Sequence, residues 1–181
     1  MSHHQETAMP SNEQSKDTAA ATLHLVCGKI AAGKSTLTRN LAKQARTVLI
    51  SEDEWLAQLY PGEIRTMTDY VRRSQSLKQA LTAHIAALLR QGLSVVLDMP
   101  ANTLDSRRWM RELIDASGAA HQLHLLDVSD EACKARLRQR NAKGAHPFSV
   151  SEAEFDHITR YFVPPSPQEG FNVVAHSNAE A

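Results

Sequence analysis

The fold is decided by the stretch Gly28-Lys29-Ile30-Ala31-Ala32-Gly33-Lys34-Ser35. It matches the pattern G-x-x-x-x-G-K-[ST], which joins a strand to a helix in proteins that bind nucleoside triphosphates. An apolar run precedes the stretch and a helical pattern follows it. The two glycines let successive backbone N–H groups surround a phosphate at the positive end of a helix. We therefore expect a P-loop at this position.

Each part of the loop has an expected role. Lys34 reaches the β- and γ-phosphates, and the hydroxyl of Ser35 binds Mg²⁺. The residues expected to contact ATP are Gly28, Lys29, Ile30, Ala31, Ala32, Gly33, Lys34, Ser35 and Thr36. A dinucleotide loop needs G-x-G-x-x-G, whereas Ile30 stands two residues after Gly28, so that alternative is excluded.

Around the loop, short apolar runs alternate with longer helical patterns, which is typical of a parallel sheet covered by helices. The expected strands are Leu23–Cys27, Thr47–Ile50, Leu93–Leu97, Gln122–Leu126 and Phe171–Ala175. The expected helices are Lys34–Ala45, Met67–Gln91, Leu104–Ser117, Asp130–Asn141 and Glu152–Phe162. We predict an α/β P-loop NTPase fold, a three-layer sandwich with strand order 2-3-1-4-5.

Composition limits the organisation and the setting of the chain. A length of 181 residues favours one domain, and we expect it over 22–176, with a disordered tail at 1–21 and a short tail at 177–181. The 20 basic and 20 acidic side chains cancel, which argues against a dedicated nucleic-acid binder. Two cysteines and the absence of an apolar segment long enough for a membrane favour a cytoplasmic protein without a membrane partner.

Acidic residues follow the second expected strand. Asp53 could accept a proton from an attacking hydroxyl, and Glu52 is a weaker substitute for that role. The alternative is that Asp53 caps a short helix that begins at Glu54. In open parallel sheets ligands bind beyond the carboxyl ends of the strands, so we favour Asp53 as the catalytic base.

The third expected strand delivers a carboxylate to the same edge. Asp98 follows three apolar residues, as a Walker-B acid does, and is a candidate Mg²⁺ ligand together with Ser35. Asn102 lies in the following loop. It could position the metal or the acceptor, or it could satisfy the backbone of a turn.

Two arginines lie four residues apart on one face of the helix after the fourth strand. Arg136 and Arg140 could fold over the transferring phosphoryl group as a lid and stabilise its charge. The alternative is that they belong to a solvated basic face, because runs of charge usually do.

Together these residues resemble the small P-loop kinases of the AAA-type ATPases, which include zeta toxins, chloramphenicol phosphotransferase and the kinase domain of polynucleotide kinases. The resemblance spans roughly Leu23 to Val174. It is carried by the P-loop, Asp53, Asp98 with Asn102, the pair Arg136 and Arg140, and a late segment from Pro165 to Glu169. It implies ATP, Mg²⁺, a lid helix and an acid that deprotonates the acceptor hydroxyl.

The expected function is therefore ATP-dependent transfer of the γ-phosphoryl group to a hydroxyl of a small molecule or nucleotide-like acceptor. Residues that could hold an anionic acceptor are Arg65, Arg72 and Arg73, and Arg107 and Arg108 have the same ambiguity between acceptor and solvent. Two alternatives stay open. One is a regulatory ATPase that acts through a protein partner, and the other is a polynucleotide 5′-hydroxyl kinase. The sequence predicts neither the acceptor nor the oligomeric state.

Overall fold

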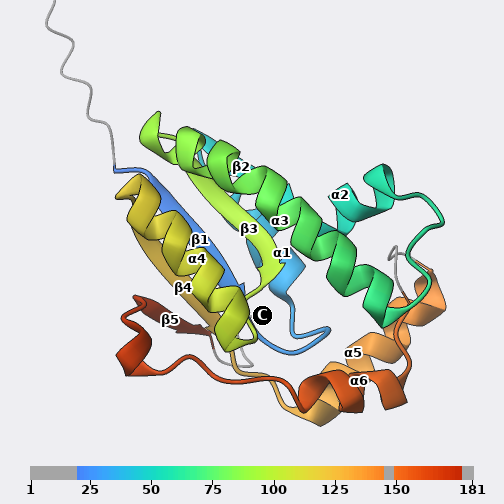
Figure 1. The fold of residues 1–181 in the computed structure, drawn as a ribbon. Helices are drawn as coiled ribbons and strands as arrows, with labels where there is room; N and C mark the ends of the chain where they lie inside the picture. The colour runs from blue at the N-terminus through green and yellow to red at the C-terminus, as the bar shows by residue number, and fades with distance from the viewer. Residues whose placement is uncertain (1–19, 145–148, 177–181) are drawn as a thin grey trace, which may run out of the picture.

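The structure is a computed structural model that describes residues 20–144 and 149–176. Both predicted tails fall almost entirely outside these residues. Five strands form one parallel sheet in the order β2-β3-β1-β4-β5, which confirms the predicted architecture and strand order (Figure 1). The strands are β1 (Thr22–Cys27), β2 (Thr47–Ser51), β3 (Ser94–Pro100), β4 (Ala120–Leu126) and β5 (Val173–His176).

Helices cover both faces of the sheet and its carboxyl edge. They are α1 (Lys34–Leu41), α2 (Glu52–Leu59), α3 (Met67–Arg90), α4 (Leu104–Ser117), α5 (Asp130–Lys143) and α6 (Glu152–Thr159). In Figure 1, α3 and α4 lie in front of the sheet, α1 lies behind it, and α5 and α6 lie together beyond the carboxyl ends of the strands. Within the described part of the chain, no helix is both long enough and apolar enough to span a lipid bilayer.

The core lies between the sheet and the two long helices. Alternate residues of β1 point to this side, and Leu23 and Leu25 are fully buried against apolar residues of α3 and α4. A second, smaller cluster joins the P-loop residue Ala32 to α5 and α6 through Leu137 and Phe155. Because this second cluster includes a P-loop residue, packing of α5 and α6 also helps to fix the loop.

Several element ends differ from the expected ones. The first helix ends at Leu41 instead of Ala45 because the chain turns tightly there and Arg46 adopts a positive φ of 58° that leads into β2. Strand β3 continues through Pro100, so Asp98 lies within the strand instead of after it. The helix after β2 begins at Glu52 and contains Asp53 in its first turn, and Ser51 is its N-cap residue. Asp53 is therefore not the cap of that helix.

A buried ion pair fastens the segment before β5 to the body of the domain. Arg107 of α4 is 1% exposed, and its guanidinium contacts both carboxylate oxygens of Glu169, at 2.6 and 3.0 Å. The same group donates to the backbone oxygens of Ala101 and Val163. The guanidinium of Arg107 is thus buried and bonded within the protein, which favours a structural role over contact with an acceptor.

Candidate active site

The P-loop connects β1 to α1 at the centre of the sheet. Gly28 lies so close to β4 that an added Cβ would meet the backbone oxygen of Leu126 at 3.0 Å. Ala31 and Gly33 have positive φ angles of 61° and 108°, which turn the loop back on itself before α1 begins at Lys34. A side chain at position 28 would push the loop away from the sheet, so glycine is required there by close approach.

Asn102, in the loop after β3, holds the entrance of the P-loop. Its Oδ1 accepts from the backbone N–H of Gly28 at 2.9 Å, and its Nδ2 donates to the backbone oxygen of Gly28 at 2.9 Å. Both polar groups of the amide are thus engaged with one residue. Of the roles expected for Asn102, the contacts favour satisfaction of loop backbone over binding of the acceptor.

Lys34 turns inward over the loop. Its ammonium donates to the backbone oxygens of Gly28 and Lys29 at 2.6 and 2.7 Å. Burial lowers the pKa of Lys34 to about 8, and nearby Asp98 and Asp53 act in the opposite direction. The ammonium is therefore held where phosphate oxygens would replace the two carbonyls as its partners.

The lowered pKa predicts that ATP affinity depends on pH. Since burial disfavours the charged form, Lys34 loses its proton as the pH rises above about 8, and a bound triphosphate would restore that proton. Affinity is expected to fall by up to roughly tenfold per pH unit above this point, with proton uptake on binding. Isothermal titration at pH 7 and pH 9 in buffers of different ionisation enthalpy measures both effects. As a control, Lys43→Met, at an exposed lysine, should show the same pH dependence of ATP affinity as the wild type. Equal ATP affinity of the wild type at both pH values would contradict the prediction.

Ser35 and Asp98 meet beside Lys34. The hydroxyl of Ser35 donates to the Asp98 carboxylate, and this bond opposes the burial that raises the pKa of Asp98. A hydroxyl and a carboxylate in contact suit Mg²⁺, which takes few protein ligands and fills its other positions with water and phosphate oxygens. No cluster of three His, Cys, Asp or Glu side chains that could hold a metal exists among residues 20–144 and 149–176. The pair thus fits a metal carried in by a nucleotide.

Asp53 and Glu52 are neighbours in sequence with different surroundings. Glu52 is 2% exposed and accepts from the hydroxyl of Ser74, while Lys78 lies 3.5 Å from its Oε1. Asp53 is half-buried and faces the site, where its charge acts on Lys34, Asp98 and Arg140. These surroundings favour Asp53 over Glu52 as the base, because Glu52 is enclosed by protein.

The two predicted lid arginines of α5 lie on the side of the P-loop. Arg136 donates to the backbone oxygen of Ala32 at 3.1 Å. Burial lowers the pKa of Arg140, and the Asp53 carboxylate opposes this shift; the Nε of Arg140 is buried without a hydrogen-bond partner. Arg138 of the same helix is engaged elsewhere, since it pairs with Glu152 of α6. The helix is therefore not a uniformly solvated basic face.

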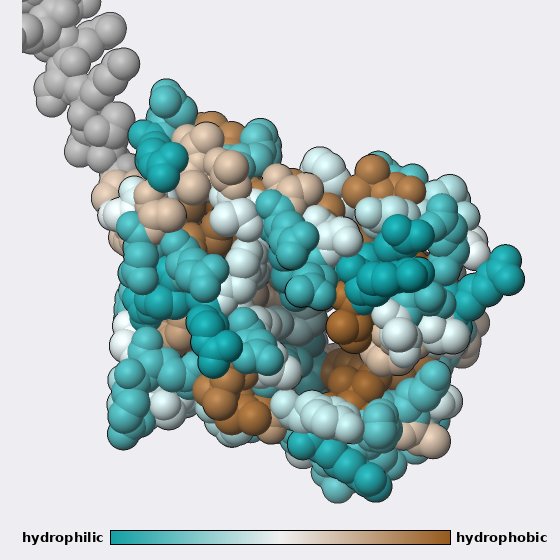
Figure 2. All heavy atoms as spheres, in the orientation of Figure 1, coloured by the Kyte–Doolittle hydropathy of each residue, from teal (hydrophilic) through white to brown (hydrophobic). Residues whose placement is uncertain are grey.

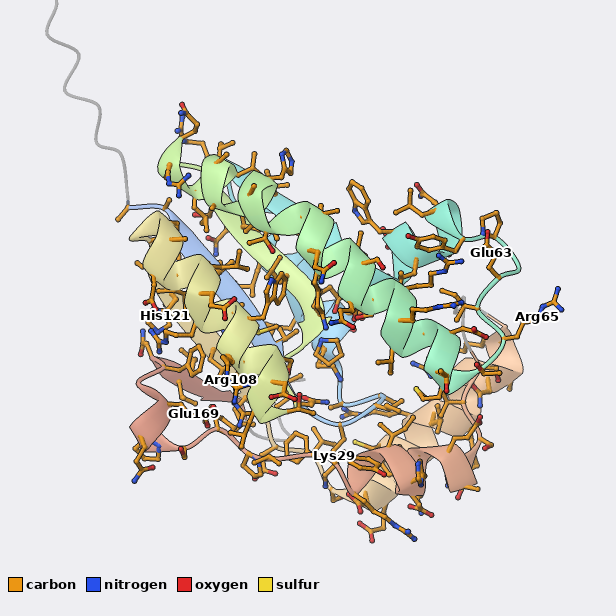
Figure 3. All side chains as sticks on the ribbon, viewed as in Figure 1. Lys29, Glu63, Arg65, Arg108, His121 and Glu169 are labelled. Atoms are coloured by element: carbon orange, nitrogen blue, oxygen red, sulfur yellow. The ribbon has the colours of Figure 1, made fainter. Side chains whose placement is uncertain are left out.

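The arginines expected to hold an acceptor lie outside this arrangement. Arg65 points into solvent in Figure 3 and donates to the backbone oxygen of Gly62 at 3.1 Å. Arg72 pairs with Asp69, and Arg73 pairs with Glu63 at 2.5 Å and lies over the ring of Tyr60. In these contacts the three arginines bind neighbouring residues and not Asp53. Arg108 is likewise exposed and pairs with Asp105.

A groove runs along the first turns of α3. It has a volume of about 340 Å³ and is lined by Met67, Thr68, Val71, Arg72 and Gln75. Figure 2 shows the surface hollowed between α3 and the α5–α6 pair, with apolar side chains exposed on its walls. Of the arginines expected to hold an acceptor, only Arg72 reaches the groove.

Sequence reasoning missed several residues that shape the site. Tyr70 and Ser74 of α3 contact Glu52, and Asp130 at the start of α5 pairs with the P-loop residue Lys29. A signal for the α3 residues exists in retrospect, because Tyr70, Ser74 and Lys78 are spaced by four and form one polar stripe beside the apolar one. Asp130 offered no such signal, since its partner Lys29 lies 101 residues away in the sequence.

Comparison with known proteins identifies the family. A family model described as AAA domain matches residues 23–165. The chain belongs to this AAA domain family. The match covers the P-loop, Asp53, Asp98 and both α5 arginines. A search of curated proteins finds no match to the AAA domain chain.

Solved structures share the fold of this AAA domain. A Chloroflexus aurantiacus protein described as a kinase is 24% identical, with a TM-score of 0.69 over 87% of this chain and 85% of that one. Kti12 of Chaetomium thermophilum, in complex with ADP-AlF3, is 15% identical, with a TM-score of 0.66 over 86% and 89%. A sugar kinase from Janibacter sp. is 16% identical, with a TM-score of 0.62 over 89% and 87%. At these identities the likeness shows the fold, that of the small P-loop kinases.

Proposed function

We propose that the protein is an ATP-dependent kinase that transfers the γ-phosphoryl group to the hydroxyl of a small molecule or nucleotide-like acceptor. The observation that carries the proposal is the position of Asp53. Its carboxylate acts electrostatically on the P-loop lysine, on Asp98 and on Arg140 of α5. A carboxylate between the phosphate site and a lid arginine is placed to receive a proton from an attacking hydroxyl.

In the proposed reaction, the acceptor hydroxyl gives its proton to the Asp53 carboxylate while its oxygen forms a bond to the γ-phosphorus. The bond from that phosphorus to the bridging oxygen breaks, and ADP leaves with the electron pair. Lys34, Arg136 and Arg140 stabilise the charge that spreads over the phosphoryl oxygens. Ser35 and Asp98 would hold Mg²⁺, which supplies charge neutralisation at the β- and γ-phosphates when bound.

The groove on α3 is a candidate place for a small acceptor. All of its lining residues belong to the first turns of α3, the helix whose Tyr70 hydroxyl lies 3.1 Å from Oδ1 of Asp53. Its walls are largely apolar and its one cation, Arg72, is already paired with Asp69. A stripe of cations for a nucleic-acid backbone is absent from this wall of the described structure, which favours a small molecule over a 5′-end of DNA or RNA.

The proposal is tested by measuring ADP release across nucleosides, sugars, antibiotics and 5′-hydroxyl oligonucleotides, with Mg²⁺ and ATP. We expect one class to raise ADP release well above the rate without acceptor, and the phosphorylated product to be visible by mass spectrometry. Release that no acceptor changes, but that a bound protein partner does, would instead indicate a regulatory ATPase. Product found only with oligonucleotides would indicate a 5′-hydroxyl kinase.

A further inference from the structure

Tyr70 of α3 joins two carboxylates that come from another helix. Its hydroxyl oxygen lies 3.1 Å from Oε2 of Glu52 and 3.1 Å from Oδ1 of Asp53. Those two acids are consecutive in the first turn of α2, whereas Tyr70 follows Asp53 by 17 residues. The hydroxyl thus makes a contact between the two helices at the point where the predicted base lies.

The Glu52 side of this contact is fixed. Glu52 is almost fully buried, accepts from the hydroxyl of Ser74 and pairs with Lys78 at 3.5 Å. All three of its partners, Tyr70, Ser74 and Lys78, belong to one stripe of α3. A buried carboxylate with several charge-assisted and neutral donors is held more firmly than a half-exposed one. Glu52 is therefore an anchor, and the half-buried Asp53 is the member that faces the site.

The tyrosine itself is held in place by the start of α3. Thr66 caps the helix, with its hydroxyl accepting from the backbone N–H of Asp69 and the Asp69 carboxylate accepting from the backbone N–H of Thr66. The backbone N–H of Tyr70 donates to the oxygen of Thr66 at 3.1 Å. This capping box fixes the first turn, so the phenol is directed at α2 from a rigid helix end.

We propose that Tyr70 is a positioning residue for the base: its hydroxyl holds the Asp53 carboxylate in place by linking it to the buried Glu52. The inference rests on the proposed kinase function, in which Asp53 receives the acceptor's proton. Burial and the two nearby carboxylates raise the pKa of Tyr70 well above its ordinary value, so the hydroxyl keeps its proton. One proton serves one carboxylate at a time.

A hydrogen bond to Tyr70 holds Asp53 in both of its protonation states. Before transfer, Tyr70 donates its one proton to the Asp53 carboxylate, and the capped first turn of α3 keeps the phenol beside Glu52. After Asp53 has taken the acceptor's proton, Asp53 can donate to the phenol oxygen while Tyr70 donates to Glu52. No proton leaves the three groups in this exchange, and the base stays at the same place during the reaction.

Tyr70→Phe tests the inference because it removes the hydroxyl and keeps the ring. With the acceptor found by the ADP-release screen, or with water as acceptor, we expect kcat to fall roughly 10²-fold, the loss associated with a misplaced catalytic group. The KM for ATP and the affinity for ADP should stay within about twofold, since the nucleotide contacts are untouched. The matched control is Tyr161→Phe, at a tyrosine that is 62% exposed in the turn after α6.

The decisive comparison is a double-mutant cycle with Asp53→Asn. If Tyr70 acts through Asp53, then Tyr70→Phe adds less than about twofold to the loss caused by Asp53→Asn alone. The inference would be overturned if the rate loss of the double variant equalled the product of the two single losses. It would also be overturned if Tyr70→Phe raised the KM by the same factor by which it lowered kcat. Either result would leave the kinase proposal standing. If the wild-type protein phosphorylates no acceptor, the proposed kinase function and the proposed role of Tyr70 are both overturned.

Should Tyr70→Phe fail to fold, Ser74→Ala provides the second variant. It removes one donor from the anchor Glu52 and leaves both Tyr70 and Asp53 in place. We expect a several-fold fall in kcat with an unchanged KM for ATP. A folded Ser74→Ala protein with wild-type kcat would overturn the role of Glu52 as the anchor.

Discussion

Asp53→Asn is expected to lower phosphoryl transfer by roughly 10² to 10⁴-fold, the usual contribution of a general base. The amide keeps the shape of the side chain and cannot take the acceptor's proton. ATP affinity should stay within several-fold, because the P-loop contacts of the nucleotide do not involve Asp53. Steady-state ADP release with the identified acceptor measures the first effect, and nucleotide titration measures the second.

Two further variants separate a chemical role for Asp53 from other causes. Asp105→Asn, at a carboxylate that is 88% exposed on α4, should transfer at the wild-type rate. Glu52→Gln should lower the melting temperature, because it breaks a buried pair with Lys78. Transfer at the wild-type rate by Asp53→Asn would remove Asp53 from the mechanism.

Arg107→Met is expected to destabilise the fold by about 3 to 5 kcal/mol, the cost of removing one partner of a buried ion pair. The variant leaves Glu169 with a side chain that is only 18% exposed and no longer paired with Arg107. It also takes a donor from the backbone oxygens of Ala101 and Val163. Urea denaturation followed by circular dichroism gives the difference in the free energy of unfolding.

The adjacent arginine supplies the control for this experiment. Arg108 is 70% exposed and pairs with the exposed Asp105, so Arg108→Met should change the free energy of unfolding by no more than about 0.5 kcal/mol. Equal effects of the two variants would contradict the stabilising role of the buried pair of Arg107 and Glu169. A pH series adds a second check.

The direction in which stability changes with pH follows from the pKa of Glu169. Hydrogen bonds from Arg107 hold the pKa of Glu169 below its ordinary value. The resulting stabilisation is present above the unfolded pKa and is lost as the pH falls through the folded one. The free energy of unfolding of Arg107→Met should therefore decrease less on acidification than that of the wild type.

The fold was predictable because its signals are local. The P-loop lies between a strand and a helix in the sequence itself, and apolar runs of strand length alternate with helical patterns throughout. Strand β3 was predicted too short because its last residues, Asp98 and Pro100, are polar or helix-breaking types that also end strands. Side-chain pattern alone does not reveal that the backbone at Asp98 still pairs with Ser51.

Residues of the candidate site could be predicted only where the position in the sequence points to one role, as for an acidic residue near the carboxyl end of a strand. Asp53 follows β2 and Asp98 is among the last residues of β3, at the edge of the sheet where chemistry is expected, and the structure brings both near Lys34. Partners from distant segments were not predictable. Arg107 falls on the buried face of α4, and its pairing with Glu169 links positions 62 residues apart. Without several sequences to compare, no pattern connects two such positions.

The strand order also sets the time at which the protein can acquire its loop during synthesis. Strand β1 is central and pairs with β3 and β4. Leu25 of β1 therefore cannot form its pair with Leu123 of β4 until β4 has been synthesised. At the usual rate of translation, roughly 5 to 20 seconds separate the emergence of two such residues from the ribosome. Until β4 is available, the close approach of Gly28 to Leu126 cannot form. A nascent chain that stops before β4 is therefore expected to hold no nucleotide, although its P-loop sequence is complete.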